Sequence, residues 1–338
     1  MKPRSLENSI QTNVLCIIAL ALFILPVLPC YAAALPTMHD KGVIAVSINP
    51  DPDVYPSLNA WLHSRKVAFI TGTFPEVPGL IFDVCAYEAG GGSIIPDLIG
   101  VSVPGDNTIV TRHSIRENPG LIHVTTFTAE PGAVDVVAHL ELDPEIDPDK
   151  AVLPKEVGYP NMCWALQRST NFVGGGDPIN PETVENYPDW ISRCFLFTDK
   201  KVSFLDKLDR PKTNEVPEDD FRNMPGGWSM HYIGVWQKPG PQWWPNTSAD
   251  RYNLPLVGAV SRDGKYLTAL VCKSSTYVAQ AWHTCLHHGQ QWEPADAPLL
   301  ERTWRMKLYA MENNPDALLV RVKKDFPGIE KLQEKRVE

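Results

Sequence analysis

Short runs of alternating apolar and polar residues dominate the chain from Val67 onward. Three of these runs cover residues 109–115, 134–142 and 302–311. A period of two places alternate residues on opposite faces of a β-strand. One predicted face consists of Ile109, Thr111, His113, Ile115, Val134, Val136, Ala138, Leu140, Leu142, Trp304, Met306, Leu308 and Ala310. We expect antiparallel strands with one packed face and one face open to solvent or a ligand.

Turn signals join several of these runs into hairpins. Pro131-Gly132 separates 122–128 from 134–142, and Asp263-Gly264 separates 257–261 from 266–272. Both dipeptides are typical of tight turns between paired strands. One helix is predicted near the C-terminus, from a cap at Asn314 and a proline at the first helical position to about Lys324.

The predicted fold class is all-β. We expect a large antiparallel β-sandwich, similar to a super-sandwich, with a short C-terminal helix. No composition break divides residues 35–338, so we predict a single domain. A long stretch around 144–250 is dense in proline, glycine and aromatic residues, and we predict a loop-rich insertion there.

The first residues have the three parts of a secretory signal. Lys2 and Arg4 precede the apolar run Val14–Leu28, and the small residues Ala32–Ala34 follow it. We predict a signal peptide over 1–34 and a secreted or periplasmic mature protein. The apolar run is shorter than the roughly 20 residues that span a bilayer, which argues against a membrane anchor. No second apolar run is long enough to span a membrane, so we expect no stable membrane insertion after signal removal. Pro29 argues against lipoprotein processing at Cys30.

The charge balance bears on the partner. Removal of residues 1–34 leaves 29 basic and 39 acidic residues, a net charge of about −10. A nucleic-acid binder usually carries a basic patch, so we predict no nucleic-acid partner.

Five cysteines remain after signal removal. Cys163–Cys194 and Cys272–Cys285 are possible disulfides, and the odd count leaves at least one thiol free. Buried free cysteines are the alternative.

The segment 282–288 gathers His283, Cys285, His287 and His288. His283 and His287 have the i, i+4 spacing that aligns two metal ligands on a helix, but the preceding residues 274–281 resemble a strand. We therefore assign no metal site and no cofactor. The preferred hypothesis is that His283, His287 or His231 acts as a general base or acid, since the ordinary pKa of imidazole lies near neutral pH.

Aromatic residues form a second group. Rings can stack on the C–H faces of sugars, while tryptophans in a β protein can equally fill the core. We predict a sugar-binding platform of Trp236, Trp243, Trp244, Trp282 and Tyr232, and we assign Trp304 to the core. Arg168 or Arg112 could hold the carboxylate of an acidic sugar by paired hydrogen bonds.

The segments YPNMCWALQRS, GAVSRDGKYLTAL and QAWHTCLHHGQQW resemble an uncharacterised family of secreted bacterial proteins. At fold level, the strand pattern is similar to galactose-mutarotase-like super-sandwiches, which bind sugars and also occur in polysaccharide lyases. No activity follows from the family resemblance. The fold-level similarity, the clustered histidines and tryptophans and the predicted signal together favour an exported carbohydrate-binding or carbohydrate-processing protein with a saccharide ligand. An enzyme of this kind would be a mutarotase-like epimerase or a lyase. The alternatives are a non-catalytic carbohydrate-binding module and an envelope-interaction module.

Overall fold

The structure is a computed structural model of the chain. It describes residues 43–48, 68–85, 88–89, 98–105, 107–115, 118–147, 160–166, 168–173, 190, 192–198, 201–204, 228–231, 246–273, 275–281, 285–290 and 296–329. All of these residues lie in the unit Leu35–Glu338, which the chain's internal contacts separate from the segment before it.

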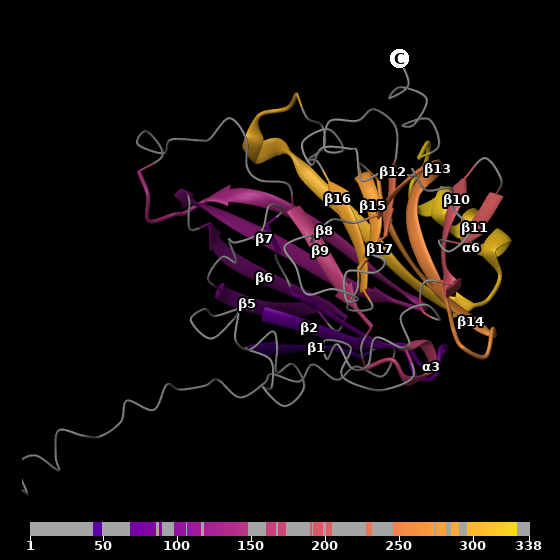
Figure 1. The fold of residues 1–338 in the computed structure, drawn as a ribbon. Helices are drawn as coiled ribbons and strands as arrows, with labels where there is room; N and C mark the ends of the chain where they lie inside the picture. The colour runs from indigo at the N-terminus through magenta and orange to yellow at the C-terminus, as the bar shows by residue number, and fades with distance from the viewer. Residues whose placement is uncertain are drawn as a thin grey trace, which may run out of the picture. The chain divides into compact units, whose positions relative to one another are not determined.

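The first of two large sheets, sheet A, runs in the order β1-β2-β3-β9-β16-β15-β12-β13 (Figure 1). Its strands are β1 (Val43–Ile48), β2 (Ala68–Thr73), β3 (Ile81–Cys85), β9 (Pro160–Ala165), β16 (Cys285–Gln290), β15 (Ser275–Ala281), β12 (Trp228–His231) and the first part of β13 (Asn246–Val260). All of these neighbours pair antiparallel except β12 and β15, which are parallel. A short strand, β4 (Glu88–Ala89), pairs separately with β9.

The second sheet, sheet C, runs in the order β5-β6-β7-β8-β17-β14-β13-β10-β11 and is antiparallel throughout. Its strands are β5 (Leu98–Gly105), β6 (Thr108–Ile115), β7 (Asn118–Glu130), β8 (Ala133–Leu142), β17 (Thr303–Glu312), β14 (Tyr266–Cys272), the second part of β13, β10 (Cys194–Thr198) and β11 (Lys201–Phe204). The strand β13 therefore belongs to both sheets.

The two sheets pack face to face around one apolar core. Phe82 and Trp164 from sheet A and Leu308 from sheet C are all fully buried in it. The indole Nε1–H of Trp164 donates to the sulfur of Met306 across the core, at 3.1 Å. This packing defines an inner face for each sheet and leaves each with an outer face.

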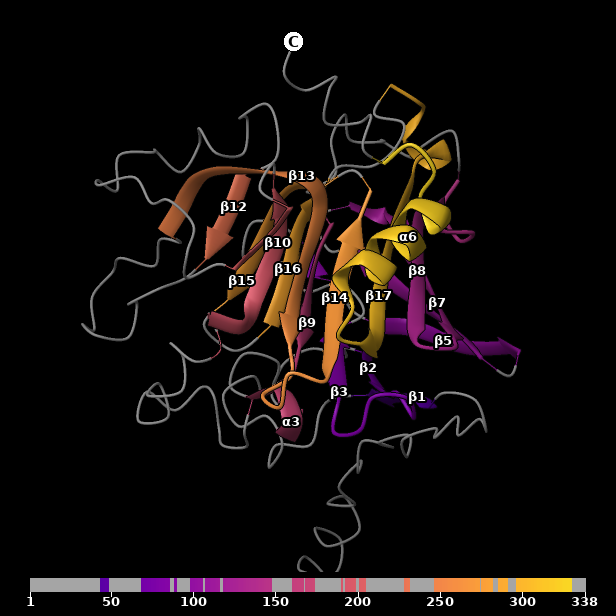
Figure 2. The ribbon, with the colours of Figure 1, turned by 90° about the vertical axis from the view of Figure 1, so that its right-hand side faces the viewer.

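The outer face of sheet C is partly covered by helix α6 (Pro315–Asp325), as Figure 2 shows. Leu318 and Val322 of the helix pack in a second apolar cluster with strand residues such as Tyr309. Asn314 caps the helix by accepting a hydrogen bond from the Ala317 amide at 3.0 Å. Two short helices complete the described elements, α3 (Thr170–Val173) and η5 (Leu299–Glu301). Within the described part of the chain, no helix has the length and apolar character needed to cross a membrane.

The predicted all-β sandwich class with a short C-terminal helix is confirmed. The turns at Gly132 and Gly264 adopt the positive φ that the hairpin prediction requires, 61° and 72°. The stretch 144–250, predicted to be rich in loops, also supplies strands β9 to β12 and the start of β13. Residues 1–34 lie outside the described residues, so the signal peptide stays a prediction.

The two possible disulfides are wrong. Cys194, Cys272 and Cys285 are buried and take part in no disulfide. Cys194 and Cys272 belong to the core between the sheets. Cys285 precedes the core residue Leu286 on β16, and alternation therefore places it on the outer face of sheet A. Cys272 and Cys285 are thus on opposite sides of sheet A.

Candidate functional site

Sheet A brings together two segments that the sequence analysis singled out. β12 carries His231, and β16 carries His287, and only β15 lies between these strands. In register, His231 is aligned with Gln280 of β15, and Gln280 with Leu286 of β16. The side chain of His231 is outside the described residues.

On β16, the alternation separates the histidines. His288 shares the inner face with Leu286 and is fully buried, whereas His287 is partly exposed on the outer face. The Nε2 atom of His287 is in hydrogen-bonding contact with the thiol of Cys285, two residues earlier on the same face. An extended strand produces this pairing, because residues i and i+2 project from the same side.

His288 joins the two sheets. Its Nε2 lies 2.8 Å from the carbonyl oxygen of Leu270 in β14, and its Nδ1 lies 3.1 Å from the hydroxyl of Ser275. A carbonyl can only accept, so Nε2 carries the proton and donates to Leu270. Burial lowers the pKa of His288 to about 3. This histidine is a neutral cross-link in the core.

Arg168 lies beside the outer face of sheet A, where it binds Asp83. Its Nε donates to one carboxylate oxygen at 2.8 Å, and its Nη2 donates to the other oxygen and to the hydroxyl of Thr71. The Thr71 hydroxyl also donates to Asp83, at 2.6 Å. We predicted that Arg168 would hold the carboxylate of an acidic sugar, but in the structure its guanidinium binds the carboxylate of Asp83 instead.

The local sequence explains the position of this arginine. Ser169 is buried and fixed to the start of β3, because its Oγ accepts from the Ile81 amide at 2.9 Å and donates to the Ile81 carbonyl. Asp83 side-chain atoms are only 1% exposed. A single acid in the apolar run Ile81–Cys85 is the sequence signal that could have identified Asp83 as the partner of a cation.

Arg112 is on the other side of the sandwich. Alternate residues of β6, beginning with the core residue Ile109, are buried, and Arg112 falls between them. Arg112 therefore lies on the outer face of sheet C. Its Nη2 donates to Glu141 at 2.6 Å, and His139 Nε2 lies 2.9 Å from the same carboxylate. Burial alone would raise the pKa of Glu141, but hydrogen bonds from His139 and Arg112 outweigh it and lower that pKa. The structure does not bring Arg112 together with Arg168 or His287.

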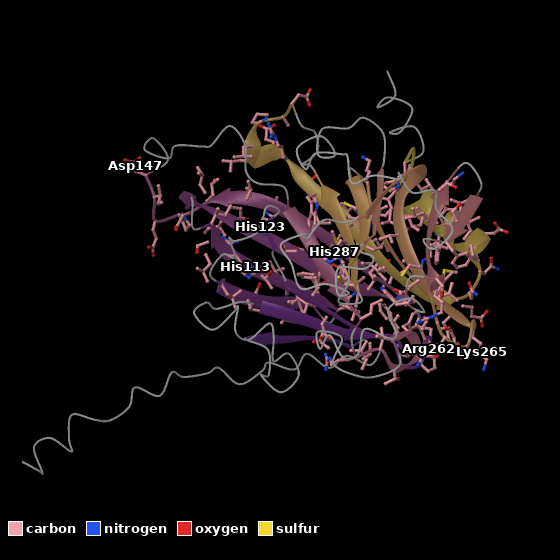
Figure 3. All side chains as sticks on the ribbon, in the orientation of Figure 1. His113, His123, Asp147, Arg262, Lys265 and His287 are labelled. Atoms are coloured by element: carbon pink, nitrogen blue, oxygen red, sulfur yellow. The ribbon has the colours of Figure 1, made fainter. Side chains whose placement is uncertain are left out.

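Two further histidines face the core. His113 of β6 and His123 of β7 are register partners, both 0% exposed (Figure 3). The Nδ1 of His123 lies 3.2 Å from the hydroxyl of Thr125. Burial lowers the pKa of His113 to about 4, and burial together with the charges of His113 and His139 lowers the pKa of His123.

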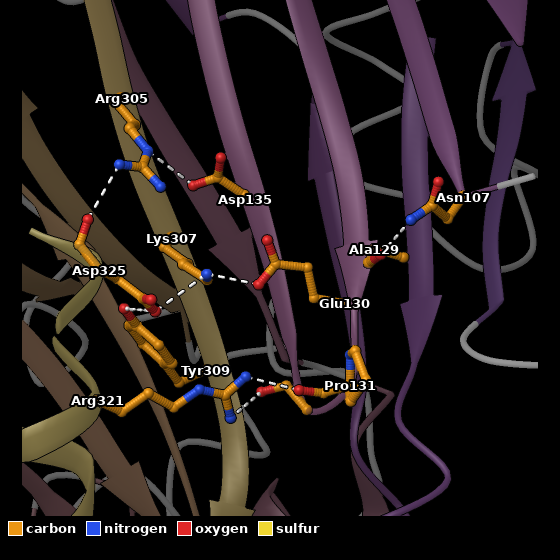
Figure 4. Close-up of polar contacts among 11 residues, drawn as sticks. Asn107, Ala129, Glu130, Pro131, Asp135, Arg305, Lys307, Tyr309, Arg321 and Asp325 are labelled. Carbon is orange, nitrogen blue, oxygen red and sulfur yellow. Dashed lines mark hydrogen bonds and ion pairs between the residues drawn. The ribbon is translucent and has the colours of Figure 1, made fainter. Parts of the chain in front are cut away.

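A charged network fastens α6 to sheet C (Figure 4). The ammonium group of Lys307, only 3% exposed, lies 2.6 Å from Glu130 and 3.0 Å from Asp325. The Tyr309 hydroxyl donates to Asp325 at 2.8 Å. Burial, followed by the hydrogen bond and charge of Asp325, raises the pKa of Tyr309. Every member bonds within the chain, which indicates a structural role.

The remaining predicted site residues are Trp236, Trp243, Trp244, Trp282, Tyr232 and His283, and all lie outside the described residues. Among the side chains that are described, no group of three or more histidine, cysteine or acidic residues is arranged to hold a metal ion. Comparisons with protein-family models, with curated proteins and with solved structures found no match.

Proposed function

We propose that this protein binds a saccharide on the outer face of sheet A, over β12, β15 and β16. The observation that carries the proposal is the placement of β12 and β16 with one strand between them. Neighbouring strands are about 4.8 Å apart, so the two segments are separated by roughly 10 Å, within the reach of one oligosaccharide.

The ligand class follows from the residues that adjoin these strands. Tyr232 follows β12 directly, and Trp236 comes four residues later in the sequence. Trp243 and Trp244 precede β13, and Trp282 belongs to the connection from β15 to β16. Aromatic rings with polar edges suit the alternating C–H and hydroxyl surfaces of sugars. The proposal is limited to binding. Export and a mutarotase-like or lyase-like reaction stay predictions from the sequence.

The test is a binding screen of the purified full chain against neutral and acidic polysaccharides by affinity electrophoresis, with calorimetry for those that retard it. Replacing both Trp243 and Trp244 by alanine should weaken binding at least tenfold, which corresponds to about 1.4 kcal/mol. Phe204→Ala is the matched control, because this exposed ring is on β11 of the other sheet. Products should also be screened for unsaturated sugars.

The outcomes are separable. Failure of every polysaccharide to retard the chain would contradict the proposal. It would also be contradicted by a double tryptophan variant that binds as tightly as the Phe204→Ala control.

A further inference from the structure

The strands of sheet A contain few charged residues. The seven described strands from β1 to β12 in the sheet order include only one aspartate, glutamate, lysine or arginine, which is Asp83 of β3. Sheet C differs, because its adjacent strands β8 and β17 together carry five such residues. These seven strands of sheet A therefore supply mainly uncharged side chains to its outer face.

The single carboxylate of these strands is balanced by a cation of the chain. Asp83 lies on the outer face, because it alternates with the core residues Phe82 and Val84. Arg168 donates to both carboxylate oxygens, from Nε at 2.8 Å and from Nη2. The pair adds no net charge to the face. Arg168 also spends on Asp83 the two-donor edge with which a guanidinium would hold the carboxylate of a sugar.

Other described polar groups of this face are uncharged or balanced as well. The hydroxyl of Thr71 donates to Asp83. The thiol of Cys285 and the imidazole of His287 are in hydrogen-bonding contact, and the two groups together have no net charge whichever of them holds the shared proton. An ionised ligand group placed on this face would lose water without gaining a counter-charge, and that loss is costly.

The charge of the whole chain acts in the same direction. Residues 35–338 contain 29 basic and 39 acidic residues, a net charge of about −10. A protein of this charge repels a polyanion at long range and slows its association. Both the local and the overall charge therefore disfavour an acidic polysaccharide.

We infer that the saccharide bound on the outer face of sheet A is neutral, with neither carboxylate nor amine groups. This inference rests on the proposed function and specifies its ligand. The hydroxyl groups of a neutral sugar are satisfied by uncharged donors and acceptors, and its C–H faces are satisfied by aromatic rings. The pair of Asp83 and Arg168 then determines specificity, because it withholds the charge of Arg168 from an acidic ligand.

The first experiment compares matched polymers on the purified full chain at one ionic strength. The pairs are hydroxyethylcellulose with carboxymethylcellulose, and methyl-esterified polygalacturonan with polygalacturonate. Affinity electrophoresis and calorimetry should show tighter binding of the neutral member. Equal or tighter binding of the acidic member would overturn the inference and leave saccharide binding in place. If no polysaccharide binds, neutral or acidic, the proposed function fails and the inference fails with it.

The second experiment tests the pair itself. Asp83→Asn keeps the size of the side chain but leaves the charge of Arg168 unbalanced. Binding of the acidic polymers should strengthen about fivefold, the effect of roughly one unit charge at about 4 Å in water. The gain should disappear at about 1 M salt, which screens such a charge.

Glu141→Gln is the matched control, because it unbalances Arg112 in the same way on the outer face of sheet C. No gain in Asp83→Asn, or an equal gain in both variants, would overturn the role of Asp83 and Arg168 in specificity. The polymer comparison uses the unsubstituted chain, so it decides the ligand class even if Asp83→Asn fails to fold.

Discussion

His113 and His123 face each other across β6 and β7 on the inner side of sheet C, where both are fully buried. The pKa of His113 is lowered to about 4 by burial, so the folded protein keeps it neutral where an unfolded chain would protonate it. Its contribution to stability is therefore complete above about pH 6.5 and is lost as the pH falls toward 4.

This relationship predicts acid sensitivity above the range where carboxylates titrate. Between about pH 6.5 and pH 4.5, His113 alone should lower the free energy of unfolding by about 2–3 kcal/mol, and His123 should add to the loss. Urea unfolding at several pH values measures the slope. His113→Leu should reduce this slope by about 1.4 kcal/mol per pH unit. If His113→Leu left the pH dependence of the free energy of unfolding unchanged, the folded protein would not lower the pKa of His113.

Loss of the bond from His288 to Leu270 should destabilise the sandwich. His288→Leu removes the donor to a buried carbonyl and leaves the Ser275 hydroxyl without its ring partner. We expect a cost of about 1–3 kcal/mol in the free energy of unfolding. His139→Leu is the matched control, because this partly exposed histidine should cost less than about 1 kcal/mol. Equal costs would argue against a cross-linking role.

Substitution of the two arginines predicted to bind a carboxylate should lower the free energy of unfolding by different amounts. Arg168→Ala leaves the buried Asp83 carboxylate without its guanidinium, and we expect a loss of about 3 kcal/mol. Arg112→Ala should cost about 0–1 kcal/mol, because its partner Glu141 is 38% exposed. Thermal and urea unfolding of both variants provide the comparison. An Arg168→Ala variant with unchanged stability would show that the fold does not need this arginine, which would then be available to bind a ligand.

Substitutions in the network beneath α6 should have strongly non-additive effects on the free energy of unfolding. Asp325→Ala deprives buried Lys307 of one carboxylate and removes the acceptor of Tyr309. In Lys307→Met the same carboxylate is no longer needed to balance a buried charge. A double-mutant cycle should therefore give a coupling of about 1–3 kcal/mol between Lys307 and Asp325. Additive losses would show that Glu130 alone satisfies the ammonium group.

Local patterns predicted much of the fold because they depend on neighbours in the sequence. Residues Val134 to Leu140 alternate into the core as expected, Trp304 is buried, and Asn314 caps the helix. The same rules assigned residues 274–281 to a strand, and β15 covers Ser275–Ala281. Hairpins and caps are determined within a few residues, and a single sequence reports them directly.

The candidate site was less predictable because its contacts are long-range. Nothing near Arg168 in the sequence indicates that Asp83 will bind it, and the separation of Arg112 onto the other sheet depends on how the sheets stack. The i, i+4 spacing of His283 and His287 would align two ligands on a helix, but His287 is on a strand. On that strand His287 and His288 point to opposite faces. Strand order determined each of these outcomes, and alternation alone does not determine strand order.

That order has a consequence for synthesis. β16 and β17, which occupy residues 285–290 and 303–312, are central strands of sheets A and C and join the early strands to the later ones. Neither sheet can be completed until β16 and β17 have left the ribosome. A polypeptide truncated before residue 285 would expose the edges of β9 and β8, each a template for pairing with another chain. Completion of both sheets therefore depends on β16 and β17, which are among the last strands to be synthesised.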